Sequence, residues 1–196
     1  MRPGDEVPTQ AWRDGGALDL ADHDHLTGLW NRRGFEDEFD RRVADSRRTG
    51  ERLALLSIDV DGYRDVIGRH GARAAEGLIR SIALVLAKRL RPHETLARTG
   101  GDEFAAVIPG ATPLHVQSVA DELCTAVREQ SHAVGSSRVH ATVSIGGIFL
   151  DPRTTTHHEA LAAAEAAVYE AKAAGADRAI LHEPSQRAGP RSQGDS

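Results

Sequence analysis

Two short acidic stretches have the residue types and the spacing to hold a cation. The stretch GGDEF places Asp102 and Glu103 directly after two glycines, and the stretch IDVD places Asp59 and Asp61 on either side of a valine. Like charges on a tight turn repel each other, and a metal ion between them offsets that repulsion. Alternate residues of a strand point to the same face, so we expect Asp59 and Asp61 to face one way. If the GGDEF turn lies beside the end of the IDVD strand, Asp59 and Asp102 reach one point.

Carboxylates that lie close together at a strand end can bind a divalent metal ion. Two carboxylates and one backbone carbonyl, here that of Val60, suit Mg²⁺ or Mn²⁺, which keeps its other positions for water and phosphate oxygens. Metal-assisted phosphoryl transfer needs this arrangement, because the ion holds the attacking oxygen and stabilises charge on the phosphate. Each stretch alone has a simpler interpretation, as solvated acids at a strand end and as an ordinary hairpin turn. Their combination in one chain favours the metal site.

Helical and strand patterns alternate along the chain and predict an α/β (α+β) fold. The predicted helices cover 31–48, 71–90, 112–130 and 157–175, and the predicted strands cover 52–60, 95–99, 103–109, 138–150 and 178–182. Interleaved helices and strands around one hairpin indicate a ferredoxin-like or palm-type fold, in which helices flank a central, mostly antiparallel sheet. The hairpin carries GGDEF, and we expect its two glycines to supply positive φ angles.

Length and composition limit the classes of protein. With 196 residues, 40% of them hydrophobic, the chain is long enough for one domain, which we place at 21–183 between a flexible arm (1–20) and a disordered tail (184–196). The formal net charge of −5 argues against a nucleic-acid-binding protein. No apolar run approaches the length of a membrane span, and Cys124, the single cysteine, excludes an internal disulfide. We therefore expect a cytoplasmic protein with no membrane partner.

The chain from Asp24 to about Ile180 resembles the GGDEF family of diguanylate cyclases. Five blocks carry the resemblance, in the order and at the spacing of the family: DHLTGLWNRRGF at 24–35, IDVDGYR at 58–64, RTGGDEF at 98–104, TVSIGG at 142–147 and AAVYEAKAAG at 166–175. The resemblance implies a palm-type nucleotidyl cyclase fold and the Mg²⁺-dependent condensation of two GTP molecules into cyclic di-GMP and pyrophosphate. It also implies a homodimer in which each subunit holds one GTP and each 3′-hydroxyl attacks the α-phosphate of the other nucleotide.

The same resemblance assigns roles to the acidic residues. Asp59, the carbonyl of Val60 and Asp102 would bind the metal ion. Glu103, the neighbouring acid of the signature, would lie near the 3′-hydroxyl and help to deprotonate it.

A second group of residues would hold the nucleotide. The resemblance implies that the nucleotide approaches the turn closely at Gly100 and Gly101. The backbone N–H groups of Gly62 and Tyr63 would bind the phosphates. Arg64 and Lys172 would balance the charge of the triphosphate. Arg64 stands where the family usually has lysine, and its planar guanidinium would meet phosphate with a different geometry.

Besides Arg64, four further positions depart from the family pattern. Ile67 stands where a base-reading Asn is usual and Glu76 where the family has Asp, while Ala176 replaces a phosphate-binding Arg and Glu165 an Asp. Isoleucine cannot hydrogen-bond a base, and one such lost bond costs about 1–3 kcal/mol when its partner is left buried. Glu76 would still favour guanine over adenine, because a carboxylate accepts from guanine N1–H and N2–H₂ and is repelled by the bare N1 of adenine. We expect weaker GTP binding than in a typical member.

A product-inhibitory site is common in the family, written RxxD and ending six residues before the signature. This chain has RPHE at that place, from Arg91 to Glu94. Arginine can bind a phosphate and stack on guanine, and Glu94 would accept from guanine as Asp does.

The sequence therefore predicts a diguanylate cyclase that acts as a transient homodimer, since no coiled coil or receiver domain is recognised. Two alternatives remain open: a degenerate member that binds GTP or cyclic di-GMP as a regulatory module, and a cyclase with altered nucleotide choice. Ile67 and Ala176 support the alternatives. The intact GGDEF signature favours catalysis, because degenerate members commonly lose these acids.

Overall fold

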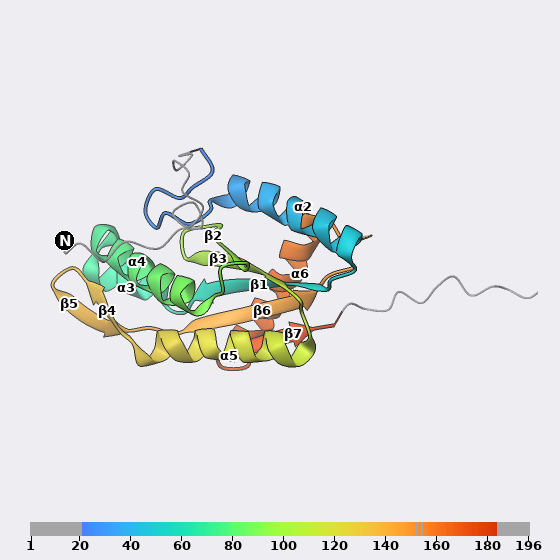
Figure 1. The fold of residues 1–196 in the computed structure, drawn as a ribbon. Helices are drawn as coiled ribbons and strands as arrows, with labels where there is room; N and C mark the ends of the chain where they lie inside the picture. The colour runs from blue at the N-terminus through green and yellow to red at the C-terminus, as the bar shows by residue number, and fades with distance from the viewer. Residues whose placement is uncertain (1–20, 152, 154, 184–196) are drawn as a thin grey trace, which may run out of the picture.

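Helices and strands alternate through the computed structural model, which describes residues 21–151, 153 and 155–183 (Figure 1). The predicted arm and tail lie outside the described residues. The helices are α2 (Arg32–Thr49), α3 (Tyr63–His70), α4 (Ala72–Arg89), α5 (Pro113–Glu129) and α6 (His157–Ala173). The strands are β1 (Leu53–Val60), β2 (Thr95–Arg98), β3 (Glu103–Pro109), β4 (Ser131–Val134), β5 (Ser137–His140), β6 (Val143–Phe149) and β7 (Ala179–His182).

The main sheet has five strands in the order β2-β3-β1-β6-β7. Its neighbours pair antiparallel except β6 and β7, which run parallel. The predicted mixed fold, with a mostly antiparallel sheet flanked by helices, is confirmed. Figure 1 shows α2 and α5 on opposite sides of this sheet.

The central strand β1 is buried on both faces, which explains its unbroken apolar run. Leu56 and Ile58 belong to the larger core, which α4 and α5 cover. Leu55 belongs to the second core, where it packs with Phe35 and Phe39 of α2 and with residues of α6. Both phenylalanines are fully buried, as their helical spacing predicts, and each such burial contributes about 1.5–3 kcal/mol.

Helix starts follow the local sequence. The Thr112 hydroxyl accepts from the backbone N–H of His115 at 3.2 Å, and Pro113 begins α5, so the predicted start is confirmed. Thr156 and Glu159 form a reciprocal capping box at the start of α6. These caps fix where the helices begin relative to the sheet.

The strand predicted over 138–150 is wrong in its extent. The structure divides it into β5, which pairs with β4, and β6, which enters the main sheet. A two-residue turn joins β4 to β5, and Gly135 in that turn has a φ of 59°, which glycine adopts readily. A Gly-Ser pair between alternating residues is a hairpin signal, but the continuous alternation from 138 onward obscured it.

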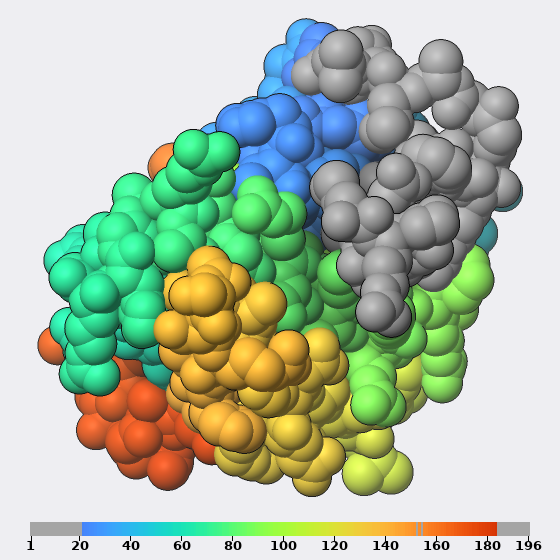
Figure 2. All heavy atoms as spheres, turned by 90° about the vertical axis from the view of Figure 1, so that its left-hand side faces the viewer, coloured from blue at the N-terminus to red at the C-terminus, as the bar shows by residue number. Residues whose placement is uncertain are grey.

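A second addition to the expected order is the short helix α3, directly after β1. It begins after Gly62, whose φ of 68° turns the chain out of the strand. Figure 2 shows the end of the molecule where α3 and α4 (teal to green) and the β4–β5 hairpin (gold) come to the surface. Among the described residues, no helix has the length and apolar character needed to cross a membrane.

Candidate functional site

The two acidic stretches lie side by side because β1 pairs with β3. In the register of these strands Asp59 is opposite Glu103, and the backbone N–H of Val60 donates to the carbonyl of Asp102 at 3.1 Å. Backbone hydrogen bonds therefore hold Asp59, Val60, Asp102 and Glu103 together where β1 ends and β3 begins.

Asp59 is a half-buried carboxylate in a mixed electrostatic environment. Burial raises its pKa, the ammonium of Lys172 lowers it, and the charges of Asp102 and Asp61 raise it again, with a net increase. Lys172 Nζ lies 2.5 Å from Asp59 Oδ1. The predicted phosphate-binding lysine and the predicted metal ligand thus form an ion pair across α6 and β1.

Glu103 lies within the same group of charges. Burial raises its pKa, and the charges of Glu165, Asp102 and Asp59 add to the increase, while Arg32 opposes it. Glu165 on α6 is exposed. Four carboxylates therefore repel one another around the GGDEF turn, and a positive ligand would relieve this repulsion.

The prediction of positive φ at the two turn glycines is wrong. Neither Gly100 nor Gly101 has a φ in the left-handed region. A Cβ at Gly100 would lie 2.2 Å from Glu103 Oε2, so this glycine makes room for the glutamate side chain. A Cβ on Gly101 would meet nothing within 4 Å, so that glycine borders open space. Room for the Glu103 side chain therefore accounts for Gly100, and backbone conformation accounts for neither glycine.

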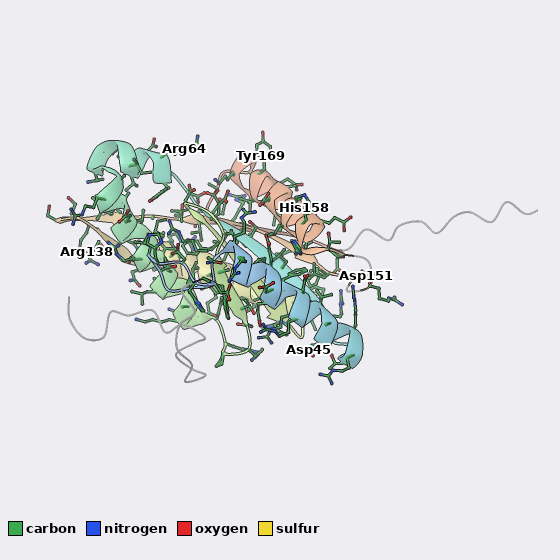
Figure 3. All side chains as sticks on the ribbon, turned by 90° about the horizontal axis from the view of Figure 1, so that it is seen from above. Asp45, Arg64, Arg138, Asp151, His158 and Tyr169 are labelled. Carbon is green, nitrogen blue, oxygen red and sulfur yellow. The ribbon has the colours of Figure 1, made fainter. Side chains whose placement is uncertain are left out.

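The amino terminus of α3 faces the same region. The helix begins at Tyr63, and its N-cap residue Gly62 has no side chain to cap the first backbone N–H groups. Tyr63 is partly buried and packs against the larger core. Burial raises the pKa of its phenol, the charge of Arg98 lowers it, and the charges of Asp102 and Glu76 raise it. Arg64 is exposed on α3 (Figure 3).

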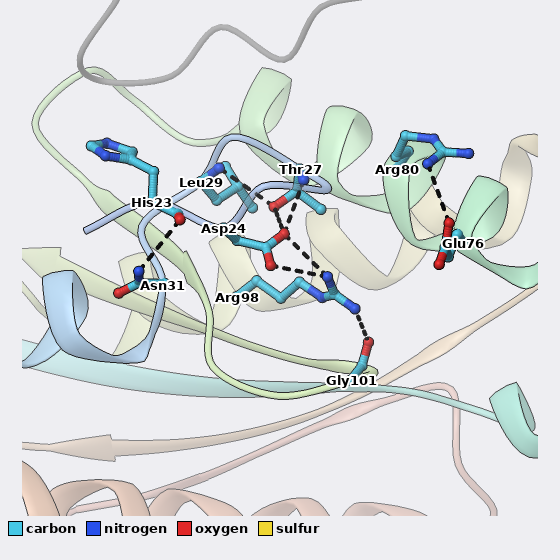
Figure 4. A network of polar contacts seen from close by, with 9 residues as sticks. All are labelled: His23, Asp24, Thr27, Leu29, Asn31, Glu76, Arg80, Arg98 and Gly101. Carbon is cyan, nitrogen blue, oxygen red and sulfur yellow. Dashed lines mark hydrogen bonds and ion pairs between the residues drawn. The ribbon is translucent and has the colours of Figure 1, made fainter. Parts of the chain in front are cut away.

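The two predicted base-reading positions lie on α3 and α4. Ile67 is partly buried on α3. Glu76 is half exposed on α4, and its Oε2 lies 3.8 Å from Nη1 of Arg80, four residues later (Figure 4). The Glu76 carboxylate is therefore accessible.

Arg98 is a structural residue of the turn that sequence reasoning did not single out. Its Nη1 lies 3.1 Å from both carboxylate oxygens of Asp24, and its Nη2 donates to the carbonyl of Gly101 at 2.7 Å (Figure 4). Burial alone would raise the pKa of Asp24, but hydrogen bonds from Thr27 and the charge of Arg98 lower it. Arg98 thus ties the GGDEF turn to the segment before α2. Both residues lie in the sequence blocks quoted above, but their pairing across 74 residues has no local signal.

Asp61 is engaged differently from Asp59. Its carboxylate accepts from the hydroxyls of Thr142 and Ser144, both at 2.7 Å. Those bonds turn it toward β6, away from a role as a shared metal ligand.

The two residues of the predicted product-inhibitory site, Arg91 and Glu94, differ in their exposure to solvent. Arg91 is exposed, whereas the Glu94 side chain is only 1% exposed. Glu94 Oε2 accepts from the backbone N–H of Arg91 at 2.6 Å, and Oε1 lies 3.8 Å from Nε2 of His115. In this conformation the Glu94 carboxylate closes its own loop and does not face solvent.

The acids at the strand end fit a divalent cation that arrives with a ligand. In the part of the chain that the structure describes, no three His, Cys, Asp or Glu side chains form a ready metal cluster. Mg²⁺, however, commonly takes only one or two protein carboxylates and completes its shell with water and substrate phosphates. The donors here are hard oxygens, and the ammonium beside Asp59 demonstrates that this edge accommodates positive charge.

A hairpin that presents adjacent acids beside an acidic strand end, within a mostly antiparallel sheet, defines a palm-type α/β domain. The family profile described as "Diguanylate cyclase, GGDEF domain" matches residues 21–178. This chain belongs to the GGDEF diguanylate cyclase family.

Curated relatives agree with this assignment. The probable diguanylate cyclase DgcE of Escherichia coli is 33% identical over 169 residues, covering 86% of this chain and 15% of DgcE. The diguanylate cyclase TpbB of Pseudomonas aeruginosa is 33% identical over 78% of this chain and 35% of TpbB. The response regulator PleD of Caulobacter vibrioides is 30% identical over 84% of this chain and 37% of PleD. The chain spans well under half the length of these three relatives.

Solved structures share the fold. The GGDEF domain of DgcB from Caulobacter crescentus, in complex with c-di-GMP, has a TM-score of 0.77 at 29% identity and covers 82% of this chain and 93% of that one. Diguanylate cyclase SiaD from Pseudomonas aeruginosa, in complex with its activator SiaC, has a TM-score of 0.79 at 27% identity and covers 88% of this chain and 67% of that one.

Proposed function

We propose that this domain is a diguanylate cyclase that condenses two GTP molecules into cyclic di-GMP and pyrophosphate. The observation that carries the proposal is the antiparallel register that puts Asp59 and Val60 beside Asp102 and Glu103. The reaction needs two nucleotides in opposite orientation, so we propose a transient homodimer with one GTP per subunit. The buried Cys124 and the substrate class fit action in the cytoplasm.

Asp59, the Val60 carbonyl and Asp102 would hold Mg²⁺ or Mn²⁺. When bound, the ion would polarise the phosphate and lower the pKa of the attacking hydroxyl. Lys172, which now pairs with Asp59, would then be available to the triphosphate. Its ammonium can reach either partner, because the side chain is long and about 40% exposed.

Glu103 is the proposed general base for the 3′-hydroxyl. A base acts best when its pKa lies near the working pH, and burial together with three neighbouring carboxylates raises the pKa of Glu103. Gly100 leaves room for this side chain, and Gly101 leaves open space in which a nucleotide could approach the backbone.

The phosphates would meet the amino terminus of α3. Uncapped backbone N–H groups at a helix start bind anions, and those of Gly62 and Tyr63 lie at the end of β1, beside the acids. Arg64 is exposed on α3, and its guanidinium would add a positive charge beside the triphosphate.

The base would lie near Ile67 and Glu76. Glu76 can accept from the N1–H and N2–H₂ groups of guanine, while Ile67 offers only an apolar contact. We therefore propose GTP as the substrate, bound more weakly than by a domain with asparagine at position 67.

A binding function is the second candidate, and a specific observation favours it. Ile67 and Ala176 remove one base contact and one phosphate contact that the family resemblance implies. A domain that retains nucleotide or cyclic di-GMP binding without turnover would then act as a regulatory module. The same two positions also leave open a cyclase that uses a different nucleotide. A product-binding role for Arg91 would require the buried Glu94 to turn outward.

The test is to incubate the purified protein with Mg²⁺ and each nucleoside triphosphate, singly and in mixtures, and to identify products by mass. The proposal expects cyclic di-GMP from GTP alone, at a rate that rises more steeply than the protein concentration. Nucleotide binding without any product, at protein concentrations that allow dimers, would establish the binding module instead. A mixed cyclic dinucleotide would establish the altered specificity.

A further inference from the structure

The aspartate that the metal site does not use, Asp61, holds the corner between α6 and β7. Its Oδ2 accepts from the backbone N–H of Asp177 at 3.2 Å and from the Thr142 hydroxyl, while its Oδ1 accepts from Ser144. The backbone N–H of Asp61 also donates to the carbonyl of Thr142 at 3.0 Å. One carboxylate therefore connects the end of β1 with β6 and with the chain that follows α6.

The corner held by Asp61 has a costly backbone conformation. Ala176 and Asp177 have φ angles of 59° and 51°, and they are the non-glycine residues with positive φ in the described part of the chain. A side chain on Cβ disfavours this left-handed region, so such residues persist only where surrounding contacts hold them. The contacts here are the Asp61–Asp177 hydrogen bond and an ion pair in which Arg128 Nη1 lies 2.8 Å from Asp177 Oδ2.

Lys172 stands one helical turn before this corner. The backbone N–H of Gly175 donates to the Lys172 carbonyl, and that of Ala176 donates to Ala171, so the corner and the last turn of α6 form one hydrogen-bonded unit. Asp59 near the end of β1 and Asp61 directly after that strand thus hold both parts of the unit: Asp59 holds the Lys172 ammonium, and Asp61 holds the backbone that follows.

Asp61 also directly precedes Gly62, the N-cap residue of α3. Its contacts therefore fix two elements relative to each other, the start of α3 and the end of α6. Those elements carry the N–H groups and the ammonium that the proposed function assigns to the triphosphate.

We infer that Asp61 is a positioning residue that sets the phosphate pocket by clamping the left-handed Ala176–Asp177 corner. The inference rests on the proposed function for its phosphate role, whereas the clamp itself is independent of it. Loss of the clamp lets Lys172 move relative to α3 and weakens contacts made in both the bound and the reacting state. The expected signature is a raised KM for GTP at nearly constant kcat.

The test compares Asp61→Ala with Asp61→Asn and with a matched control, Asp121→Ala. Asp121 is an exposed carboxylate of α5 that accepts from Gln117. Asp61→Ala should raise KM for GTP about tenfold with kcat changed less than about threefold, and Asp61→Asn, which keeps an acceptor oxygen, should recover part of the loss. Asp121→Ala should change neither parameter. An unchanged KM with a lowered kcat for Asp61→Ala would overturn the inference, because a loss of folded protein alone has that signature.

A rescue separates clamping from other roles. Glycine adopts the left-handed conformation without cost, so Ala176→Gly in the Asp61→Ala background should restore part of the affinity for GTP. No recovery would contradict the strained-corner explanation. If Asp61→Ala does not fold, Thr142→Val, which removes one donor to the same oxygen, should raise KM in the same direction, and an unchanged KM there would overturn the inference.

Hydrogen exchange of the Asp177 amide gives a readout that needs no activity. Asp61→Ala should speed this exchange at least about tenfold more than Asp121→Ala does, because the amide loses its acceptor. Unchanged protection would overturn the clamp even in an active enzyme. If the wild-type chain neither binds nor converts GTP, the phosphate role of Asp61 is overturned together with the proposed function. In that case, faster exchange of the Asp177 amide in Asp61→Ala would still support the clamp, so that only the proposed function has failed.

Discussion

The metal end and the base end of the proposed site are built in different ways. The acids Asp59 and Asp102 belong to a strand end and a hairpin whose positions follow from backbone hydrogen bonds between β1 and β3. Ile67 and Glu76 lie on two separate helices, and the Glu76 side chain is half exposed. Substitution of a side chain at the base end leaves the sheet intact, whereas the metal end depends on the register of the central strands.

The departures that the family resemblance predicts lie outside the hairpin. Ile67, Glu76 and Glu165 lie on helices and Ala176 lies in the corner after α6, while the GGDEF stretch keeps both of its acids. The metal end should therefore control turnover, and the base end should control affinity and nucleotide choice.

The largest effect is expected at the metal end. Asp102→Asn keeps the shape of the side chain and removes the charge that a divalent cation needs. We expect turnover to fall at least about 10³-fold with an unchanged melting temperature. The measurement is initial rates of product formation together with thermal unfolding. Retention of a tenth or more of the wild-type rate would remove Asp102 from the metal site.

The second-largest effect is expected at Arg98, which supports the GGDEF hairpin. Arg98→Ala leaves the nearly buried Asp24 carboxylate without its cationic partner, since the two side chains are 12% and 14% exposed. We expect a loss of about 3 kcal/mol in the free energy of unfolding, measured by urea denaturation, and a loss of turnover because the Gly101 carbonyl is released. Arg48→Ala, which removes an exposed pair with Asp45, is the control and should change stability by less than about 0.5 kcal/mol. Equal effects of the two substitutions would contradict a specific role for Arg98.

A smaller effect of the opposite sign is expected at the base end. Ile67→Asn supplies the missing hydrogen-bonding group and should tighten GTP binding about tenfold, as measured by calorimetry with a non-hydrolysable GTP analogue. Ile67→Val, which adds no polar group, should leave the affinity unchanged. Weaker binding by Ile67→Asn would place the base elsewhere.

The smallest effect concerns the pH dependence of the metal end. Raised pKa values of Asp59 and Glu103 mean that both carboxyls take up protons at a higher pH than ordinary acids, so turnover should fall as the pH drops through these values. Glu165→Gln removes the neighbouring charge that contributes most, after burial, to the raised pKa of Glu103, and it should shift the acid limb to lower pH. Glu170→Gln, on the same helix but paired with His182, is the control. If Glu165→Gln does not shift the pH–rate profile, Glu103 is not the general base.

Much of the fold could be read from the sequence, because it is written in local patterns. The apolar run of β1 and the Phe35–Phe39 spacing of α2 predicted buried elements that the structure contains. The break between β5 and β6 was missed, since alternation continues through it and only tertiary pairing divides it.

The site was less predictable wherever it depends on contacts between distant residues. The Asp24–Arg98 pair and the Asp61–Asp177 hydrogen bond join segments far apart in the chain, and no local pattern signals them. The turn glycines were assigned to backbone freedom, but packing against Glu103 explains Gly100 better. The inward position of the Glu94 carboxylate likewise follows from its loop, not from its residue type.

The central claim is that Asp59 and Asp102 share one divalent cation, and a double-mutant cycle of Mn²⁺ binding tests it most directly. Binding would be followed by electron paramagnetic resonance with a GTP analogue present, in the wild type, Asp59→Asn, Asp102→Asn and the double variant. A shared ion predicts strong coupling, so that each single substitution weakens binding nearly as much as both together. Additive losses, or Mn²⁺ binding that ignores either aspartate, would contradict the account.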